Sequence, residues 1–457
     1  MEQTIKHLSV TPLDPNVLMY SRWEGNVDVY SPWTYTGWVD ETLSWKKTCY
    51  ISHHLSGMMA CLKVKGPDAE RLMSETYVNN FSLEKFPVGR AKHTIAVSSR
   101  GYVSIHGMTL RVAEDEFDTY SLDPNTPAQV FSGKYDVEQI EPVYYNDFVF
   151  QIAGPRSLEV VENALEQDIH DLPFMAFQPG VVASKKVRVL RMGMGGTLAY
   201  ELHGAAEDGP AVYAKVMEVG KAYGIRRLGM LAYMCNHTEN GFPQCGTHFD
   251  LDFTGTGVEE YLGQGGAAAG EMTGEELAPL HGSMADMGRD AYLANPFELG
   301  WGKSIYWGHD FIGKEALLKL RDDPHTRRIC TLEWSGEDLG KVFAGYFDDD
   351  PKLPDPLVFP KDYYFESAGN LSDKVLDGQG NLVGRSTGFL YTAYYKRVIS
   401  LGMIDPDLCH EGQELKVLWG TPGTRQFEVR VKVARYPYLD LTANRDMDLE
   451  TIPHYQG

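Results

Sequence analysis

Two segments of the chain share one pattern, and this repeat restricts the possible fold more than any other feature. They are residues 62–73 and residues 150–161. Each is typical of a short apolar strand, a Gly-Pro turn and an amphipathic helix, and Leu158, Val161 and Leu165 have the spacing of one helix face. A repeated strand–helix unit in a chain of mixed elements predicts an α+β fold with two related α/β lobes.

The C-terminal part of the chain consists mainly of strand-like segments. Residues 427–435 alternate apolar and polar side chains, and segments 397–404 and 414–419 are also strand-like. Several short strands in succession predict a small C-terminal β-barrel domain. Farther upstream, Pro210 and Gly224 mark the start and the end of a predicted helix.

These patterns divide the chain into four parts. We expect an aromatic-rich N-terminal arm (1–48), α/β lobes with the internal repeat (49–254), a third lobe with long insertions (255–372) and the barrel (373–457). The insertions are segment 255–285, rich in Gly, Ala and Glu, and segment 341–371, rich in Pro, Asp and aromatic residues. The aromatic residues of the arm either pack it onto the body or receive a flat ligand. They are Trp23, Tyr30, Trp33, Tyr35, Trp38 and Trp45.

Charge and cysteine usage exclude several classes of protein. The 457 residues carry a formal net charge of -21, which argues against nucleic acid and anionic membranes as partners, because phosphate binding needs clustered Lys and Arg. Six scattered cysteines without a Cys-x-x-Cys pair favour reduced thiols. No signal-peptide pattern, spanning apolar run or metal-ligand spacing is present, so we expect a cytoplasmic protein without a metal. The oligomeric state is left open.

A glycine-rich element is the most distinctive motif. A predicted strand at 185–191 leads into a turn with Gly193, Gly195 and Gly196, followed by Glu201. Glycines let the backbone turn sharply and approach a ligand, and a carboxylate between Tyr200 and a leucine is buried only for a partner. The spacing is not that of a dinucleotide fingerprint. The alternative is a surface hairpin with an exposed glutamate.

This element resembles the Gly-Glu-x-Gly-Phe-Glu motif of the aminomethyltransferase (glycine-cleavage T-protein) family, which binds tetrahydrofolate. Other motifs follow in the family's order over most of the chain, from about Thr48 to about Lys432. The matching segments are 51–53, 64–69, 150–155, 295–301, 310–317, 384–389 and 399–403. The resemblance implies a T-protein-like fold and tetrahydrofolate as cofactor.

Two departures indicate a subgroup. His106 replaces the family's loop carboxylate, and 233–241 replaces its Arg-Asp-x-Leu-Arg element, so both count against glycine cleavage. Segments 30–38, 44–50 and 195–201 are instead similar to the tetrahydrofolate-dependent aryl O-demethylases of the vanillate and syringate type. A related branch opens the methylenedioxy bridge of lignans such as sesamin.

The resemblance implies a one-carbon transferase that acts on a small aromatic ether. The main hypothesis is removal of a methylene carbon from a sesamin-type lignan, giving a catechol and 5,10-methylene-tetrahydrofolate. The first alternative is a vanillate- or syringate-type demethylase that forms 5-methyl-tetrahydrofolate. The second alternative is a non-catalytic folate-binding protein of the same fold.

Three residues are catalytic candidates. Tyr233 falls at the tyrosine that assists proton transfer to the leaving oxygen in the O-demethylases, and a phenol suits a phenolate because their proton affinities are close. His53 matches the family's Ser-His, and His106 is a candidate to protonate an acetal oxygen near neutral pH. Each of the three is alternatively a hydrogen-bonded structural residue.

Four residues are cofactor candidates. Glu201 matches the family's pterin-binding glutamate, and a carboxylate can accept two hydrogen bonds from the N–H groups at one edge of a pterin. Gln151 corresponds to a folate-contacting glutamine of the O-demethylases. Tyr200 and Phe242 are candidates to pack against the rings of the cofactor, with a core position as the alternative. Arg111 is the one nearby arginine considered for a substrate carboxylate.

Overall fold

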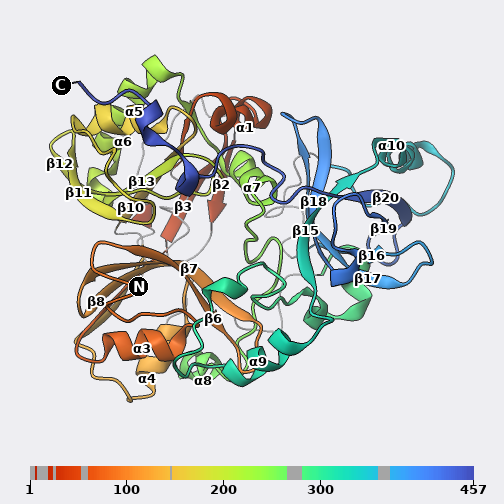
Figure 1. The fold of residues 1–457 in the computed structure, drawn as a ribbon. Coiled ribbons are helices and arrows are strands. Elements are labelled where there is room, and N and C mark those ends of the chain that lie inside the picture. The colour runs from red at the N-terminus through yellow and green to blue at the C-terminus, as the bar shows by residue number, and fades with distance from the viewer. Residues whose placement is uncertain are drawn as a thin grey trace.

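The two repeated units form two lobes that face each other (Figure 1). The computed structural model describes residues 6–7, 19–23, 27–52, 60–144, 147–264, 280–358 and 371–456. In the first lobe, β5 (Ala60–Lys65) is followed by α3 (Ala69–Thr76), and in the second, β10 (Asp147–Ala153) is followed by α5 (Ser157–Leu165). The predicted strand–turn–helix repeat is therefore confirmed.

A glycine makes the turn in each unit. A Cβ at Gly66 would lie 2.7 Å from the backbone nitrogen of Glu138, and one at Gly154 would lie 2.5 Å from the carbonyl oxygen of Thr48. Both glycines also have positive φ, at 139° and 130°. Only glycine permits a neighbouring segment to cross this close to the turn.

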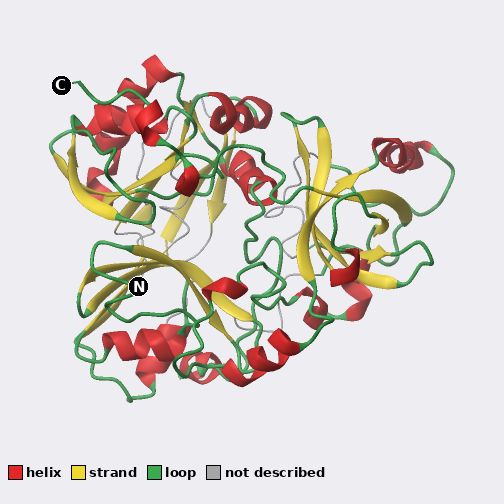
Figure 2. Cartoon of the chain, in the orientation of Figure 1, coloured by secondary structure: helices red, strands yellow, loops and turns green. Residues whose placement is uncertain are grey.

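The first lobe is built on a five-stranded sheet of order β6-β7-β8-β5-β9. Its remaining elements are β6 (Ala91–Val97), β7 (Val103–Ala113), β8 (Glu116–Tyr120), α4 (Asn125–Phe131) and β9 (Gln139–Tyr144). Leu72, Met73 and Phe117 belong to the core between this sheet and its helices. Helices α3 and α4 lie on the outer face, so the inner face is turned toward the second lobe (Figure 2).

The second lobe has a six-stranded sheet of order β11-β12-β13-β10-β4-β14. Its other elements are β4 (Tyr50–Ser52), β11 (Phe177–Val182), β12 (Lys185–Leu190), β13 (Ala199–Ala205), α6 (Gly209–Gly220) and β14 (Arg226–Arg227). The predicted helix is α6, and the short turn after it ends at Gly224 in the left-handed conformation (φ 70°). The predicted strand at 185–191 is β12.

The C-terminal domain is a closed six-stranded barrel of order β15-β18-β17-β16-β19-β20, as predicted. Its strands are β15 (Arg328–Trp334), β16 (Ser372–Leu376), β17 (Leu382–Thr392), β18 (Arg397–Ile404), β19 (Glu414–Trp419) and β20 (Phe427–Ala434). The barrel begins earlier in the sequence than the predicted residue 373, because β15 belongs to it. This strand closes the barrel by pairing with both β18 and β20. The domain bounds at 48, 254 and 372 otherwise stay a prediction.

The remaining described strands and α-helices lie outside the two lobe sheets and the barrel sheet. They are β1 (Lys6–His7), β2 (Met19–Trp23), β3 (Val27–Thr34), α1 (Trp38–Lys47), α7 (Met230–Glu239), α8 (Val258–Gly263), α9 (Lys314–Asp322) and α10 (Gly336–Ala344). Trp33, Tyr35 and Trp45 are buried, in line with packing of the arm onto the body. Parts of both predicted insertions, 265–279 and 359–370, lie outside the described residues.

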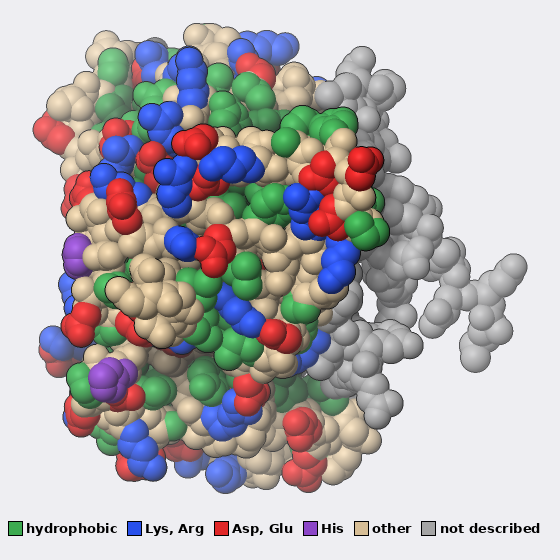
Figure 3. All heavy atoms as spheres, turned by 90° about the vertical axis from the view of Figure 1, so that its right-hand side faces the viewer, with side chains coloured by type: hydrophobic (Ala, Val, Ile, Leu, Met, Phe, Trp, Pro, Cys, Tyr) green, Lys and Arg blue, Asp and Glu red, His purple; other side chains and the backbone are tan. Residues whose placement is uncertain are grey.

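The barrel side of the molecule carries interspersed acidic and basic side chains (Figure 3). The net charge of -21 is therefore not gathered into one acidic patch on this face. No helix among the described residues is both long and apolar enough to cross a bilayer.

Candidate functional site

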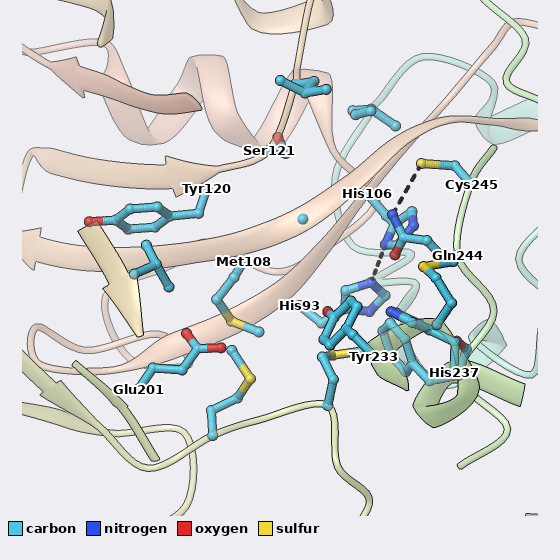
Figure 4. A pocket seen from close by; sticks show the side chains of 18 of the residues that line it. His93, His106, Met108, Tyr120, Ser121, Glu201, Tyr233, His237, Gln244 and Cys245 are labelled. Carbon is cyan, nitrogen blue, oxygen red and sulfur yellow. Dashed lines mark hydrogen bonds between the residues drawn. The ribbon is translucent and has the colours of Figure 1, made fainter. Parts of the chain in front are cut away.

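A cavity lies where the two lobes meet α7, with about 1000 Å³ of empty space including its solvent-filled mouth. Strand β7 contributes His106 and β13 contributes Glu201 to its wall. Helix α7 contributes Tyr233 and His237 (Figure 4). With Phe242, the cavity thus brings together four of the predicted site residues, which come from distant parts of the sequence.

Strand β13 turns alternate side chains toward this cavity. Glu201 and His203 line it, whereas Tyr200 belongs to the apolar core cluster on the other side of the sheet. The alternation follows from the period of two in a strand. The predicted contact of Tyr200 with the cofactor is therefore wrong: its ring is fully buried in the second lobe, and burial raises the pKa of its hydroxyl.

Glu201 is held by two side chains. Its carboxylate oxygens lie 3.1 Å from Gln151 Nε2 and 2.9 Å from His203 Nε2. Gln151 stands opposite Glu201 in the β10–β13 register, so the predicted pair is brought together. Only 3% of Glu201 is exposed, so its ionised form requires these donors.

The amide of Gln151 is fixed from its other end. Tyr50 donates its hydroxyl hydrogen to Gln151 Oε1 and accepts a hydrogen bond from Asn236 Nδ2 at 3.2 Å. The chain Asn236–Tyr50–Gln151 therefore leaves the amide NH₂ of Gln151 facing Glu201. Gln151 orients the carboxylate and is not itself one of the described residues that line the cavity.

The glycines before β13 serve protein packing. A Cβ at Gly193 would lie 2.4 Å from the Cβ of Ala199 and 3.3 Å from the side chain of Gln151. Gly196 has φ 70°, and a Cβ there would meet Asn240 at 2.5 Å. The turn is thus pressed against protein atoms, while Met192 and Met194 beside it line the cavity.

Helix α7 is anchored at both ends, which sets the position of Tyr233 and His237. At its start, Gly229 donates its backbone N–H to Glu41 Oε2 at 2.7 Å. At its end, Glu239 pairs with Lys46 Nζ at 2.6 Å, and both side chains are buried. Tyr233 is 5% exposed, and its ring meets that of His237 edge-on with centroids 5.1 Å apart.

The tautomer of His237 follows from its partner. Its Nδ1 lies 2.9 Å from the carbonyl oxygen of Phe242, which only accepts, so Nδ1 carries the hydrogen. Nε2 then presents a lone pair, and within the described structure it has no hydrogen-bond partner. His237 thus gives the cavity wall a hydrogen-bond acceptor, a feature that the sequence did not reveal.

His106 lies in a cluster of rings with His93, Phe242 and Trp301. His93 Nε2 is 3.2 Å from His106 Nδ1, and the rings of His106 and Trp301 have centroids 4.9 Å apart. Burial among these rings lowers the pKa of His106 well below its ordinary value, with smaller contributions from His93 and His237. His106 does line the cavity, but as a neutral imidazole, so it is not the protonated acid that was expected.

The structure places the three remaining candidate residues, Phe242, Arg111 and His53, in different surroundings. Phe242 lines the cavity, and its packing against a ring of the cofactor stays a prediction. Arg111 does not line the described cavity: it is 2% exposed and its guanidinium bonds to Glu70 at 2.8 Å and to backbone carbonyl groups, including that of Phe81. Its candidacy for a substrate carboxylate is therefore wrong. His53 lies outside the described residues.

The buried histidines predict a pH-dependent stability. Burial lowers the pKa of His93 and His237 to about 4 and that of His248 to about 3. Between pH 6.5 and 4 the unfolded chain therefore binds protons that the folded chain does not. The free energy of unfolding should fall as the pH falls through this window, by about 1.4 kcal/mol per histidine and pH unit at most.

Urea unfolding from pH 7.5 to 4.5 measures this effect. His93→Gln should flatten the profile, whereas the same change at the exposed His410 should leave it as it is. A stability that stays constant down to pH 4.5 would contradict the assignment of neutral buried histidines.

Comparisons with known proteins show what the whole chain is similar to. The GCVT N-terminal domain family model matches residues 23–260. A sesamin methylene transferase of Sinomonas sp. (strain No.22) is 37% identical over 438 residues, covering 93% of this chain and 94% of the relative. A syringate O-demethylase of Sphingobium sp. (strain SYK-6) is 31% identical over 431 residues and 89% of each chain.

A solved structure shows the same fold. The crystal structure of glycine cleavage system aminomethyltransferase T from Bartonella henselae superposes with a TM-score of 0.64 at 15% sequence identity, over 93% of this chain and 95% of that one. The family model covers more than half of the present chain, and the sesamin and syringate enzymes match it nearly end to end. The chain therefore belongs to the aminomethyltransferase (GCVT) family.

Proposed function

We propose that the chain is a tetrahydrofolate-dependent one-carbon transferase that removes the carbon of an aromatic methylenedioxy group, as in sesamin, and leaves a catechol. The names of the sesamin and syringate relatives support an aromatic ether as substrate. The observation that carries the proposal is the buried Glu201 carboxylate on the wall of an otherwise largely apolar cavity.

The residues at this wall fit the cofactor. Each carboxylate oxygen of Glu201 is engaged once and keeps a lone pair for the donor edge of a pterin. His203 Nδ1 is buried and has no partner within the described structure, so it is a further atom that a bound ligand would satisfy. Phe242 offers a ring for packing. When bound, tetrahydrofolate supplies the nitrogen that takes the carbon.

The rest of the cavity favours a neutral aromatic substrate. Methionine side chains adapt to irregular shapes and make favourable sulfur contacts with aromatic rings. The five that line the cavity are Met108, Met192, Met194, Met230 and Met234. Within the described lining there is no Lys or Arg to pair with a benzoate, which favours a lignan over vanillate or syringate.

The departing oxygen requires a proton. Burial lowers the pKa of His93, His106 and His237, so none of these three is an imidazolium that could give one near pH 7. We assign this step to the phenol of Tyr233, which gives its proton to the leaving oxygen as the carbon–oxygen bond breaks. His237 Nε2 then suits the hydroxyl group of the product, because it accepts a hydrogen bond.

The acceptor at His237 also supports a second candidate substrate. A methoxyphenol already carries a hydroxyl group beside the ether, and such a group would bond to His237 Nε2. Removal of a methyl group from a syringate-type ring is therefore the alternative reaction. It differs from removal of a methylenedioxy carbon in the oxidation level of the transferred carbon.

The folate product distinguishes the two substrates. A bridging carbon bonded to two oxygens is at the level of formaldehyde, so sesamin should yield 5,10-methylene-tetrahydrofolate, whereas a methoxy group yields the 5-methyl form. Sesamin and vanillate are incubated separately with the protein and tetrahydrofolate, and the products are identified by mass spectrometry. Turnover of vanillate alone would establish the alternative. Tetrahydrofolate binding without turnover of any aryl ether would indicate a non-catalytic folate-binding protein.

A further inference from the structure

One strand of the barrel supports the wall of the cavity from behind. None of the described residues that line the cavity comes from the barrel. Strand β17 nevertheless reaches the segment that follows α7, because Arg385 Nη1 donates to the carbonyl oxygen of His248 at 3.3 Å. Thr387 donates its hydroxyl hydrogen to the carbonyl oxygen of Thr247 at 3.2 Å. The barrel therefore fixes residues 247 and 248, close in the chain to the cavity-lining Gln244.

A bulge in β17 brings the barrel into contact with α7. The register of β17 with β18 shifts between Thr387 and Leu390, and Gly388 between them has φ 67°. The carbonyl oxygen of Gly388 accepts a hydrogen bond from the hydroxyl group of Thr238 at 2.9 Å. A Cβ at residue 388 would lie 2.8 Å from Thr238 Oγ1 and would also overlap His248 Nε2, so only glycine permits this approach.

His248 joins this contact to Gln244. The backbone N–H of Gln244 donates to His248 Nδ1 at 3.0 Å, and the backbone N–H of His248 donates to the carbonyl oxygen of Gln244 at 2.8 Å. His248 Nε2 lies 3.1 Å from Thr238 Oγ1, and both of these side chains are buried. These hydrogen bonds form one buried chain from the cavity wall to the barrel, and this chain fixes the backbone of Gln244.

The side chain of Gln244 lines the cavity at the end opposite Glu201, on the same side as Tyr233 and His237 (Figure 4). Its Nε2 lies 3.6 Å from Cys245 Sγ, which is a weak acceptor. The amide NH₂ has a second hydrogen, which is available to a ligand. Ligand cavities are lined mainly by apolar side chains, and a few fixed polar groups orient the ligand. Gln244, with its backbone held by His248, has the features of such a group.

We propose that Gln244 orients the aromatic substrate by donating a hydrogen bond to one of its ring oxygens, and that Thr238 and His248 are positioning residues that hold Gln244 in place. This inference rests on the function proposed above and extends it to substrate recognition. A methylenedioxy group has two oxygens that only accept, and Tyr233 is assigned to the one that leaves. The amide NH₂ of Gln244 suits the other oxygen, because it donates a hydrogen bond without carrying a charge.

Steady-state kinetics with sesamin and calorimetry with tetrahydrofolate test the proposal on the whole chain. Gln244→Met keeps the length of the side chain and matches the methionines of the cavity, but it removes the NH₂ donor. Gln244→Ala removes the whole amide. Each variant should lower kcat/KM for sesamin about tenfold, the usual effect of one lost hydrogen bond. The dissociation constant for tetrahydrofolate should stay unchanged, because Glu201 is at the other end of the cavity, and this result also shows that the variants fold.

A double-mutant cycle tests the positioning role of Thr238. Thr238→Val removes the hydroxyl group and keeps the branched shape, so it should lower kcat/KM for sesamin in the unaltered chain. In the Gln244→Ala variant the same change should have no further effect, because Thr238 acts through Gln244. The matched control is Thr331→Val, which deletes the hydroxyl group of a buried barrel threonine that has no hydrogen-bond partner within the described structure. This control should leave kcat/KM unchanged.

The possible outcomes separate this inference from the proposed function. If the unaltered chain turns over sesamin and both Gln244 variants do so equally well, Gln244 does not orient the substrate and the inference is overturned, while the proposed function stands. If Thr238→Val lowers kcat/KM equally with and without Gln244, the positioning role of Thr238 is overturned. If the unaltered chain does not turn over sesamin, the proposed function and the inference both fail.

Discussion

Tyr233→Phe should lower the rate of turnover by about 10²- to 10⁴-fold, the usual contribution of a positioned acid or base. The change deletes one hydroxyl group and keeps the ring, so α7 and its edge-on contact with His237 should be preserved. Burial lowers the pKa of His106 and His237, so neither of these neighbours is an imidazolium that would replace the lost proton donor near pH 7. Tetrahydrofolate affinity should change little, and single-turnover kinetics with calorimetry separates the two effects.

Tyr200→Phe is the matched control for this experiment. It deletes the same atom from a tyrosine that is buried in the core of the second lobe, where its hydroxyl group has no partner within the described structure. Turnover should stay near normal. If Tyr233→Phe behaves like Tyr200→Phe, Tyr233 is a packing residue and the acid lies elsewhere, with His53 the first candidate to examine.

Glu201→Ala should raise the dissociation constant for tetrahydrofolate about 10- to 100-fold. The reason is that a hydrogen bond to a charged group contributes about 1.5–3 kcal/mol, and each 1.4 kcal/mol is a factor of ten. The same change leaves Gln151 and His203 without their shared acceptor, so the melting temperature should also fall. Calorimetric titration with tetrahydrofolate measures the affinity.

Glu201→Gln distinguishes lost charge from lost volume. The amide has nearly the same size but presents an NH₂ group where the carboxylate only accepts, so tetrahydrofolate affinity should still fall while the fold is retained. Asp338, in the barrel, provides the control: Asp338→Asn removes a buried carboxylate that bonds to Arg430, far along the chain from the cavity. Normal tetrahydrofolate affinity in both Glu201 variants would exclude Glu201 from the cofactor site.

The sequence alone determined the elements whose signals are local. The repeated strand–turn–helix units, helix α6 and the last three strands of the barrel, β18, β19 and β20, follow from hydrophobic period and turn residues, which act over a few positions. The order of the motifs also placed the chain in its family. The sequence further contained one signal that was overlooked: in a strand, Tyr200 and Glu201 must face opposite sides, and His203 must share the side of Glu201.

Only the tertiary structure decided which groups meet and how they are charged. His93, His106 and His237 come from β6, β7 and α7, and it is their burial against one another that makes them neutral. Arg111 is directed to Glu70 by the packing of the first lobe rather than to a substrate. The first strand of the barrel and the C-terminal tail that carries His454 return from distant parts of the chain. Such contacts depend on how the lobes, barrel and tail pack, so a local pattern of residues cannot predict them.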